Sequence, residues 1–236
     1  MEGAPQSYFD RLDAGIAFRW RALPPRAFKA ADVNPGAAVV QLHRQGRSHR
    51  GIGEHGAIRT LLAYEVDQAF FDELCELEGL ECLYMQHLRA GDLRRISQLV
   101  NLQRLVINSA TRIADFEWVR GMPASLQSFA LEHAPRVTRL DPLADLTQLT
   151  TLAIEGSLHS RMKVESLAPL SSLVGLEFLF LTALQTSDRK LDAIAGLQKL
   201  KVLEFANYYA AGEVEKLAAY LPHTRCSWFA KVGLSG

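Results

Sequence analysis

The sequence predicts an α/β solenoid, in which short strand-and-helix units stack side by side and share one core. Two observations lead to this prediction. The phrase Leu-x-x-Leu-x-apolar recurs in steps of 22 to 27 residues, starting at Leu80, Leu102, Leu126, Leu149, Leu176 and Leu200. A second rhythm, with apolar residues three apart, leads into most copies of the phrase. Because a repeat period of about 20–50 residues is typical of stacked repeats, each unit should bury its apolar side against its neighbours.

The leucine phrase predicts the strands. Its second leucine and the apolar residue two places later lie on one strand face, because side chains alternate along a strand. We expect seven parallel strands with this face in the core, the first from a weaker copy of the phrase at Ile58, Leu61 and Ala63. A further strand within residues 37–42 and a last strand near Cys226 are also predicted.

The threefold spacing predicts the helical segments between the strands. Leu93, Ile96 and Leu99, for example, lead directly into Leu102 and lie on one side of a short helix or 3₁₀ segment. These segments are expected on the convex side of a curved stack, with the parallel sheet on the concave side. The longest step in the repeat predicts an insertion in the turn at residues 156–163.

The pattern resembles the leucine-rich-repeat family over about residues 58–222. Residues 140–149 and 167–176 look like the short bacterial repeats of the internalins. The resemblance implies a curved solenoid that binds proteins and uses no cofactor. The sequence departs from the family where an asparagine commonly follows each strand, since it has residues such as Leu88, Ala110 and Ala134 there. We therefore expect the turn backbone to find other hydrogen-bond partners.

Three segments follow from this reading of the chain. Residues 1–56 form an N-terminal cap or flanking segment, residues 57–222 a solenoid of about seven repeats, and residues 223–236 a C-terminal capping strand and tail. Apolar residues at helical spacing between Tyr8 and Trp20 predict a helix that covers the open end of the first repeat, because repeat arrays need caps.

The concave face is expected to bind the partner through side chains that point outward from the strands. Phe178 and Phe180 are the sharpest signal, because a cluster of exposed aromatic side chains is typical of interface anchors. Two alternatives stay open: a terminal segment covers these side chains, or the strand register is shifted. The predicted protein-binding residues are Tyr64, Tyr84, Gln86, Arg104, Asn108, Glu132, Glu155, Phe178, Phe180 and Glu204.

No pattern in the sequence predicts a catalytic, metal or cofactor site. Glu132 and Glu155 occupy the same slot of neighbouring repeats, about 5 Å apart, but without a matching nucleophile they indicate a solvated or weakly acidic contact patch. His43, His49 and His55 lie in a Gly- and Arg-rich stretch without metal-site spacing, so we expect a solvated loop. The protein is therefore predicted not to be an enzyme.

Charge and cysteine content narrow the class of partner and compartment. Lys+Arg and Asp+Glu both number 26, which argues against a general nucleic-acid binder. Cys75, Cys82 and Cys226 form no disulfide or metal pattern and indicate a reducing compartment, with Cys82 pointing outward as a candidate reactive thiol. The N-terminus shows no signal peptide or membrane-spanning segment, so a cytoplasmic location is expected, with signal-independent secretion left open.

The sequence thus predicts a non-enzymatic module that presents a concave surface to a protein partner, without cofactor, nucleic acid or membrane insertion. One alternative is an effector or regulator in which residues 1–56 carry a separate activity and the repeats provide targeting. Another is a nucleic-acid contact through the basic run at residues 43–50, with Arg44, Arg47 and Arg50.

Overall fold

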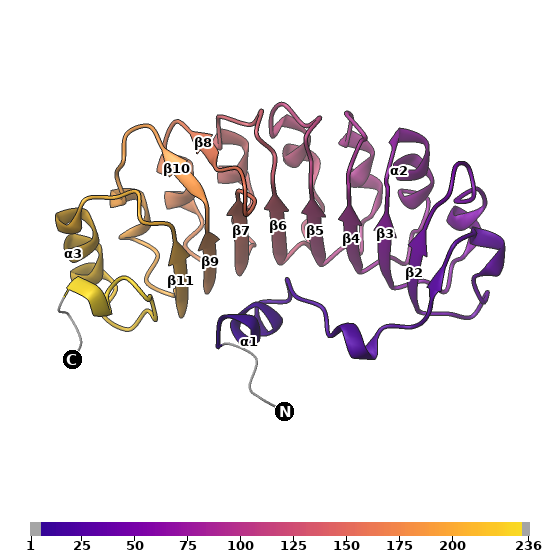
Figure 1. Ribbon diagram of the computed structural model, residues 1–236, viewed down its shortest axis with the longest axis horizontal. Helices are drawn as coiled ribbons and strands as arrows, with labels where there is room; N and C mark the ends of the chain where they lie inside the picture. The colour runs from indigo at the N-terminus through magenta and orange to yellow at the C-terminus, as the bar shows by residue number, and fades with distance from the viewer. Residues whose placement is uncertain (1–5, 233–236) are drawn as a thin grey trace.

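A curved stack of parallel strands forms the body of the protein. The computed structural model describes residues 6–232 and contains a nine-stranded sheet with strand order β1-β2-β3-β4-β5-β6-β7-β9-β11 (Figure 1). The predicted solenoid is confirmed. The strands are β1 (Arg26–Ala27), β2 (Val39–His43), β3 (Thr60–Tyr64), β4 (Cys82–Gln86), β5 (Arg104–Asn108), β6 (Ser128–Glu132), β7 (Thr151–Glu155), β9 (Phe178–Leu181) and β11 (Val202–Phe205).

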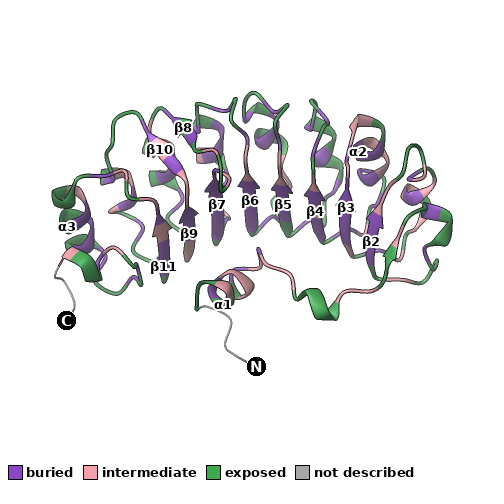
Figure 2. Ribbon diagram, viewed as in Figure 1, coloured by how far each residue is buried: buried purple, intermediate pink, exposed green. Residues whose placement is uncertain are grey.

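All seven strands predicted from the leucine phrase form, from β3 to β11, and β2 confirms the strand expected within residues 37–42. The inward residues stack in register, with Leu105 paired to Phe129 and Phe129 to Leu152, and all three are fully buried. Strands β3 to β7 are mostly purple, the colour of buried residues, in Figure 2. Burying one such side chain contributes about 1.5–3 kcal/mol before entropy is subtracted. One repeat alone buries too few of these side chains to fold, whereas stacked repeats share one core.

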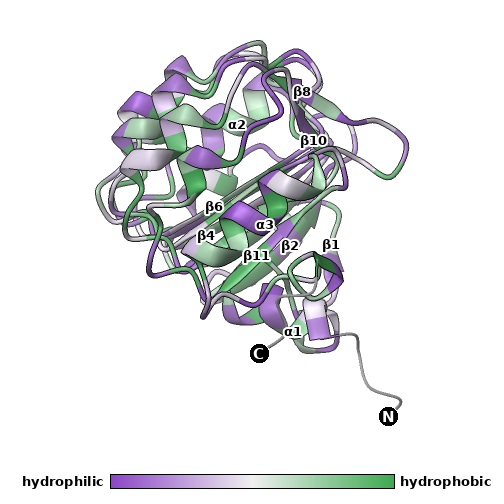
Figure 3. Cartoon of the chain, turned by 90° about the vertical axis from the view of Figure 1, so that its left-hand side faces the viewer, coloured by the Kyte–Doolittle hydropathy of each residue, from purple (hydrophilic) through white to green (hydrophobic). Residues whose placement is uncertain are grey.

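Helical segments line the convex side, as the threefold spacing predicts. They lie on the side of the sheet opposite α1 (Gln6–Asp13) (Figure 3). The Asp67 carboxylate caps α2 by accepting a 3.0 Å hydrogen bond from the Phe70 amide. The convex segments are η3 (Ile52–Glu54), α2 (Gln68–Leu74), η4 (Arg94–Gln98), η5 (Glu117–Gly121), η6 (Asp141–Asp145), η7 (Ala168–Ser172), η8 (Asp192–Ile194) and α3 (Ala211–Tyr220).

The turns after the strands are held together without an asparagine ladder. Leu88, Ala110 and Ala134 fill that position and are buried. Immediately before it, Ser109 and His133 adopt left-handed backbone conformations with φ of 57° and 59°. Their amides donate to carbonyls of the next repeat, Ser109 to Glu132 at 3.0 Å and His133 to Glu155 at 2.9 Å. The expectation that the turn backbone finds other partners is confirmed.

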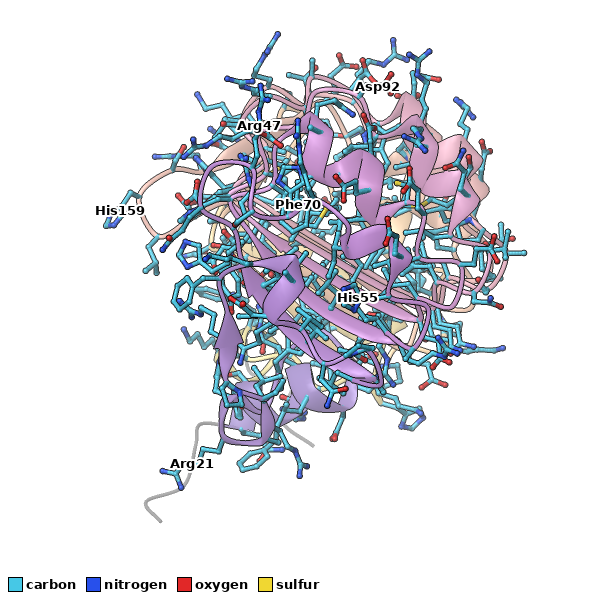
Figure 4. The ribbon with its side chains drawn as sticks, turned by 90° about the vertical axis from the view of Figure 1, so that its right-hand side faces the viewer. Arg21, Arg47, His55, Phe70, Asp92 and His159 are labelled. Carbon is cyan, nitrogen blue, oxygen red and sulfur yellow. The ribbon has the colours of Figure 1, made fainter. Side chains whose placement is uncertain are left out.

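The predicted insertion forms a protruding loop and a small second sheet. After β7 the chain makes a turn at residues 156–161 and enters β8 (Met162–Val164), which pairs with β10 (Leu184–Thr186). Gly156 is required there, because a Cβ atom would lie 2.5 Å from the Ala183 carbonyl oxygen. Leu158 in this loop is 98% exposed, and the neighbouring His159 points away from the body (Figure 4).

The C-terminal end differs from the prediction of a capping strand. Within the described residues, Arg225 makes an isolated bridge to Val202, and the chain then turns into η9 (Ala230–Val232). The Trp228 indole donates a 2.7 Å hydrogen bond to the Phe205 carbonyl, and its ring stacks on the Phe205 ring. A tryptophan, rather than another strand, therefore covers the last rung. Residues 1–5 and 233–236 of the predicted flanking segments lie outside the described residues.

Candidate protein-binding face

Residues 6–18, here called the N-terminal arm, lie across the concave face (Figure 3). Helix α1 ends in a Schellman turn, in which the Ile16 amide donates to the Arg11 carbonyl at 3.0 Å and Gly15 adopts φ +74°. This turn places Ala14 and Ile16 against the sheet, where both are buried. We expected the arm to cover the open end of the first repeat, and this prediction is wrong. At that end β1 pairs with β2 instead.

Arg11 anchors the arm on a group of carboxylates. Its guanidinium donates to Glu155 through both nitrogens, at 2.9 Å and 2.6 Å, and lies 3.6 Å from Glu204. The same guanidinium stands 4.6 Å above the centre of the Phe180 ring. A bidentate pair with a cation–π contact fixes the position and orientation of the arginine.

Apolar and polar contacts extend this attachment along the arm. Ala14 and Ile16 join one apolar cluster with the outward residues of the sheet, namely Val106, Ala130, Ala153, Phe180 and Val202. The Phe18 ring packs edge-on against Tyr84 at 5.2 Å, and the Ser128 hydroxyl donates to the Ala14 carbonyl at 3.1 Å. Within α1, buried Asp10 pairs with Arg225.

The predicted aromatic anchors have the expected strand register but not the expected exposure. Phe178 and Phe180 lie on the concave side, where Phe180 pairs with Ala153 and Glu204 across the sheet. Phe180 is nevertheless 0% exposed, because Arg11 and the apolar residues of the arm cover it, while Phe178 is half-buried. A covering terminal segment, one of the two alternatives, is what the structure contains.

The other predicted face residues divide between covered and accessible positions. Tyr64 is buried, stacked against His43 with the Arg26 guanidinium 4.6 Å from its ring centre. Tyr84 is half-buried, and burial raises the pKa of its hydroxyl to about 12. Arg104 is exposed. The partly exposed members are Gln86, Asn108, Glu132 and Glu204.

Three carboxylates, those of Glu132, Glu155 and Glu204, surround the single guanidinium of Arg11. Glu132 and Glu155 pair directly in the β6–β7 register, as their shared slot predicts. Burial raises the pKa of Glu132, and the charge of Glu155 raises it further. Burial also raises the pKa of Glu204, although Arg11 opposes this shift. The three carboxylates thus share one guanidinium in a poorly hydrated setting, which disfavours the charged forms of Glu132 and Glu204.

An open pocket of about 500 Å³ lies beside the arm, at the rim of the concave face. Its lining includes Arg11, Glu132 and Glu155, and Leu158 and Tyr208 contribute apolar surface. Sequence reasoning identified the two carboxylates but missed Arg11, Leu158 and Tyr208. The signal that could have identified Leu158 was its apolar side chain within a predicted insertion. No spacing marked Arg11, because its partner Glu155 is 144 residues away.

The histidine and arginine predictions near residues 43–55 need correction. His49 is not in a solvated loop: it is 2% exposed, its ring stacks on Phe70, and burial lowers its pKa. Arg44 is held by a 2.8 Å ion pair with Asp67, whereas Arg47 and Arg50 are exposed. The three arginines therefore do not share one free basic surface.

All three cysteines are free and buried. Cys82 points to the concave side but is buried, and burial raises its pKa to about 11, so it does not have the features of a reactive thiol. Between residues 6 and 232, no group of three or more His, Cys, Asp or Glu side chains is arranged to hold a metal ion. None of the helices in the same range has the length and hydrophobicity to cross a membrane.

Comparison with solved structures identifies the architecture. Internalin C2 from Listeria monocytogenes matches 78% of this chain and 80% of its own, with a TM-score of 0.55 and 20% sequence identity. The protein has an internalin-like leucine-rich-repeat fold. The internalin inlF from the same organism is similar over 84% of this chain and 65% of its own, with a TM-score of 0.54 and 17% identity. No protein-family model matches the sequence, and no curated protein matches it either.

Proposed function

We propose that the protein is a non-enzymatic binding module that holds a protein partner at its concave face. The observation that carries this proposal is the rim pocket, where an almost fully exposed Leu158 stands beside the carboxylates Glu132 and Glu155. Leucine-rich repeats of the internalin type are typically protein-binding, which supports the same assignment.

The chemistry of the pocket favours a partner segment with a basic side chain next to an apolar one. Glu155 is already paired with Arg11, so the Glu132 carboxylate is the group that attracts a cation, and Asn108 donates a 2.6 Å hydrogen bond that orients it. Leu158 and Tyr208 offer apolar contact in the same pocket. An exposed apolar side chain beside oriented charge is a common composition for an interface anchor.

Two variants test this proposal without touching the core. Leu158→Asp and Glu132→Lys should each abolish capture of the partner from native lysate, identified by mass spectrometry. Val174→Asp is the matched control, because Val174 is 59% exposed and lies in the turn between η7 and β9. Equal capture by all four proteins would contradict a partner site at the rim pocket.

A further inference from the structure

We propose that the N-terminal arm is an autoinhibitory strap, which occupies the concave face as an internal ligand and is displaced when a partner binds. This inference rests on the proposed function and concerns the regulation of the same face. The partner segment would present a guanidinium beside an apolar side chain, the pair of groups that the arm itself presents through Arg11 and Ile16.

The arm is built as a unit that can leave the sheet intact. Its backbone amides bond within the arm: those of Ala14, Ile16 and Ala17 donate to carbonyls of Asp10 and Arg11. The Tyr8 hydroxyl also stays within the arm and donates to the Phe18 carbonyl at 3.1 Å. Among the described residues, the arm and the sheet share no backbone–backbone hydrogen bond. Detachment would therefore break side-chain contacts and leave the strand pairing unchanged.

Apart from Asp10, Ala14 and Ile16, the residues of the arm are only partly buried or exposed. Within α1, Asp10 is buried, whereas Phe9 is 45% exposed, and Figure 2 shows the helix mostly pink and green against the purple strands. The connection to β1 is also open, since Trp20 is 55% exposed and Arg21 points into solvent (Figure 4). An exposed tether allows the arm to move without disturbing β1.

The surface below the arm has the composition of a binding site. Phe180, Val106 and Ala153 form its apolar part, and the carboxylates of Glu155 and Glu204 receive Arg11. Release of the arm would uncover Phe180 and leave these carboxylates without their guanidinium. Such a surface would be costly to leave bare, because large exposed apolar patches beside uncompensated charge favour association. A partner with the same two groups compensates for the loss of the arm.

The tether sets how strongly the arm competes. A segment on a short flexible linker acts at an effective concentration of about 1 mM. If a free copy of the arm binds the uncovered face with a Kd of about 0.1 mM, the wild-type chain should bind that copy about tenfold more weakly than a chain with a released arm. This ratio can be measured without knowing the partner.

The test uses the full chain and a synthetic, fluorescently labelled peptide of residues 6–18. Arg11→Glu combined with Ile16→Asp removes the anchor and the apolar contact of the arm, and Arg21→Glu is the control at an exposed position. Fluorescence anisotropy should show about tenfold tighter peptide binding to the double variant than to wild type or to the control. A peptide that carries Arg11→Glu should not bind any of the three chains.

Hydrogen exchange gives the second readout. Amides of residues 14–17 should be protected in wild type and lose protection in the double variant, while amides of β6 and β7 stay protected. The milder Arg11→Met variant should show intermediate exchange, and it provides a readout if the double variant misfolds. Unchanged protection of residues 14–17, or equal peptide affinity of wild type and released chain, would overturn the strap. Failure of Leu158→Asp to reduce partner capture would instead overturn the proposed function, so the two failures are distinguishable.

Discussion

Arg11→Ala should destabilise the folded protein by removing the anchor of the arm. The substitution deletes the two hydrogen bonds to Glu155, at 2.6 Å and 2.9 Å, and the contact with the Phe180 ring. A hydrogen bond to a charged group contributes about 1.5–3 kcal/mol. A cation over an aromatic ring contributes about 0.5–2 kcal/mol. Because the Arg11 side chain is 27% exposed, the lower ends of both ranges apply.

The expected loss follows from these values and from entropy. The lower ends sum to about 3.5 kcal/mol. Folding of the variant no longer immobilises an arginine side chain, which costs about 1.5–2 kcal/mol of entropy, so the net loss is about 1.5–2 kcal/mol. For a chain of this size, that loss corresponds to a Tm lower by about 3–8 °C. Urea unfolding followed by circular dichroism gives the free energy, and calorimetry gives the Tm.

A double-mutant cycle with Glu155→Gln isolates the ion pair. Arg11→Ala leaves the Glu155 carboxylate buried with the Thr182 hydroxyl as its remaining side-chain donor, so the double variant should be less destabilised than the sum of the single variants. Arg21→Ala, at an exposed position, serves as the control. If Arg11→Ala and Arg21→Ala agree within about 0.5 kcal/mol, the arm is not held as described.

Three further predictions concern the carboxylates, the insertion and the thiols. Glu132→Gln should raise the Tm at pH 7, because folding raises the pKa of this carboxyl and its charged form therefore destabilises the fold. The gain in Tm should shrink as the pH falls through that pKa. A gain that does not change with pH would contradict this cause. Gly156→Ala should cost about 1–3 kcal/mol in urea unfolding because its Cβ would meet two carbonyl oxygens, whereas Gly196→Ala, with open space, should change little. The native protein should react slowly with a thiol reagent at pH 8, because Cys75, Cys82 and Cys226 are buried, and all three thiols should react once the protein is unfolded. Rapid labelling of the native protein would refute their burial.

Periodicity made the strands predictable. Each repeat has the same strand pattern, with an inward apolar side chain at every second residue, so the register of β3 to β11 follows from the sequence alone. The pairing of Glu132 with Glu155 follows from that register. The insertion was also readable, because a longer step must leave residues outside the repeat, although its pairing as β8 with β10 was not.

The path of the arm could not be read from the sequence. The contact between Arg11 and Glu155 joins residues 144 apart and depends on a charge that the repeat pattern does not encode. The burial of Phe180 could not be predicted for the same reason. Its position on the strand follows from the repeat, but the residues that bury it belong to the distant N-terminal arm. His49 is a similar case, because its burial depends on stacking against Phe70 rather than on any feature of its own stretch of chain.

Nuclear Overhauser spectroscopy on a protein labelled at phenylalanine rings and arginine side chains tests the central claim most directly. The Phe180 ring, assigned with a Phe180→Leu variant, should show cross-peaks to the side chain of Arg11, whose guanidinium carbon lies 4.6 Å from the ring centre. Cross-peaks from Phe180 to water, with none to the arm, would show an open concave face and contradict the account.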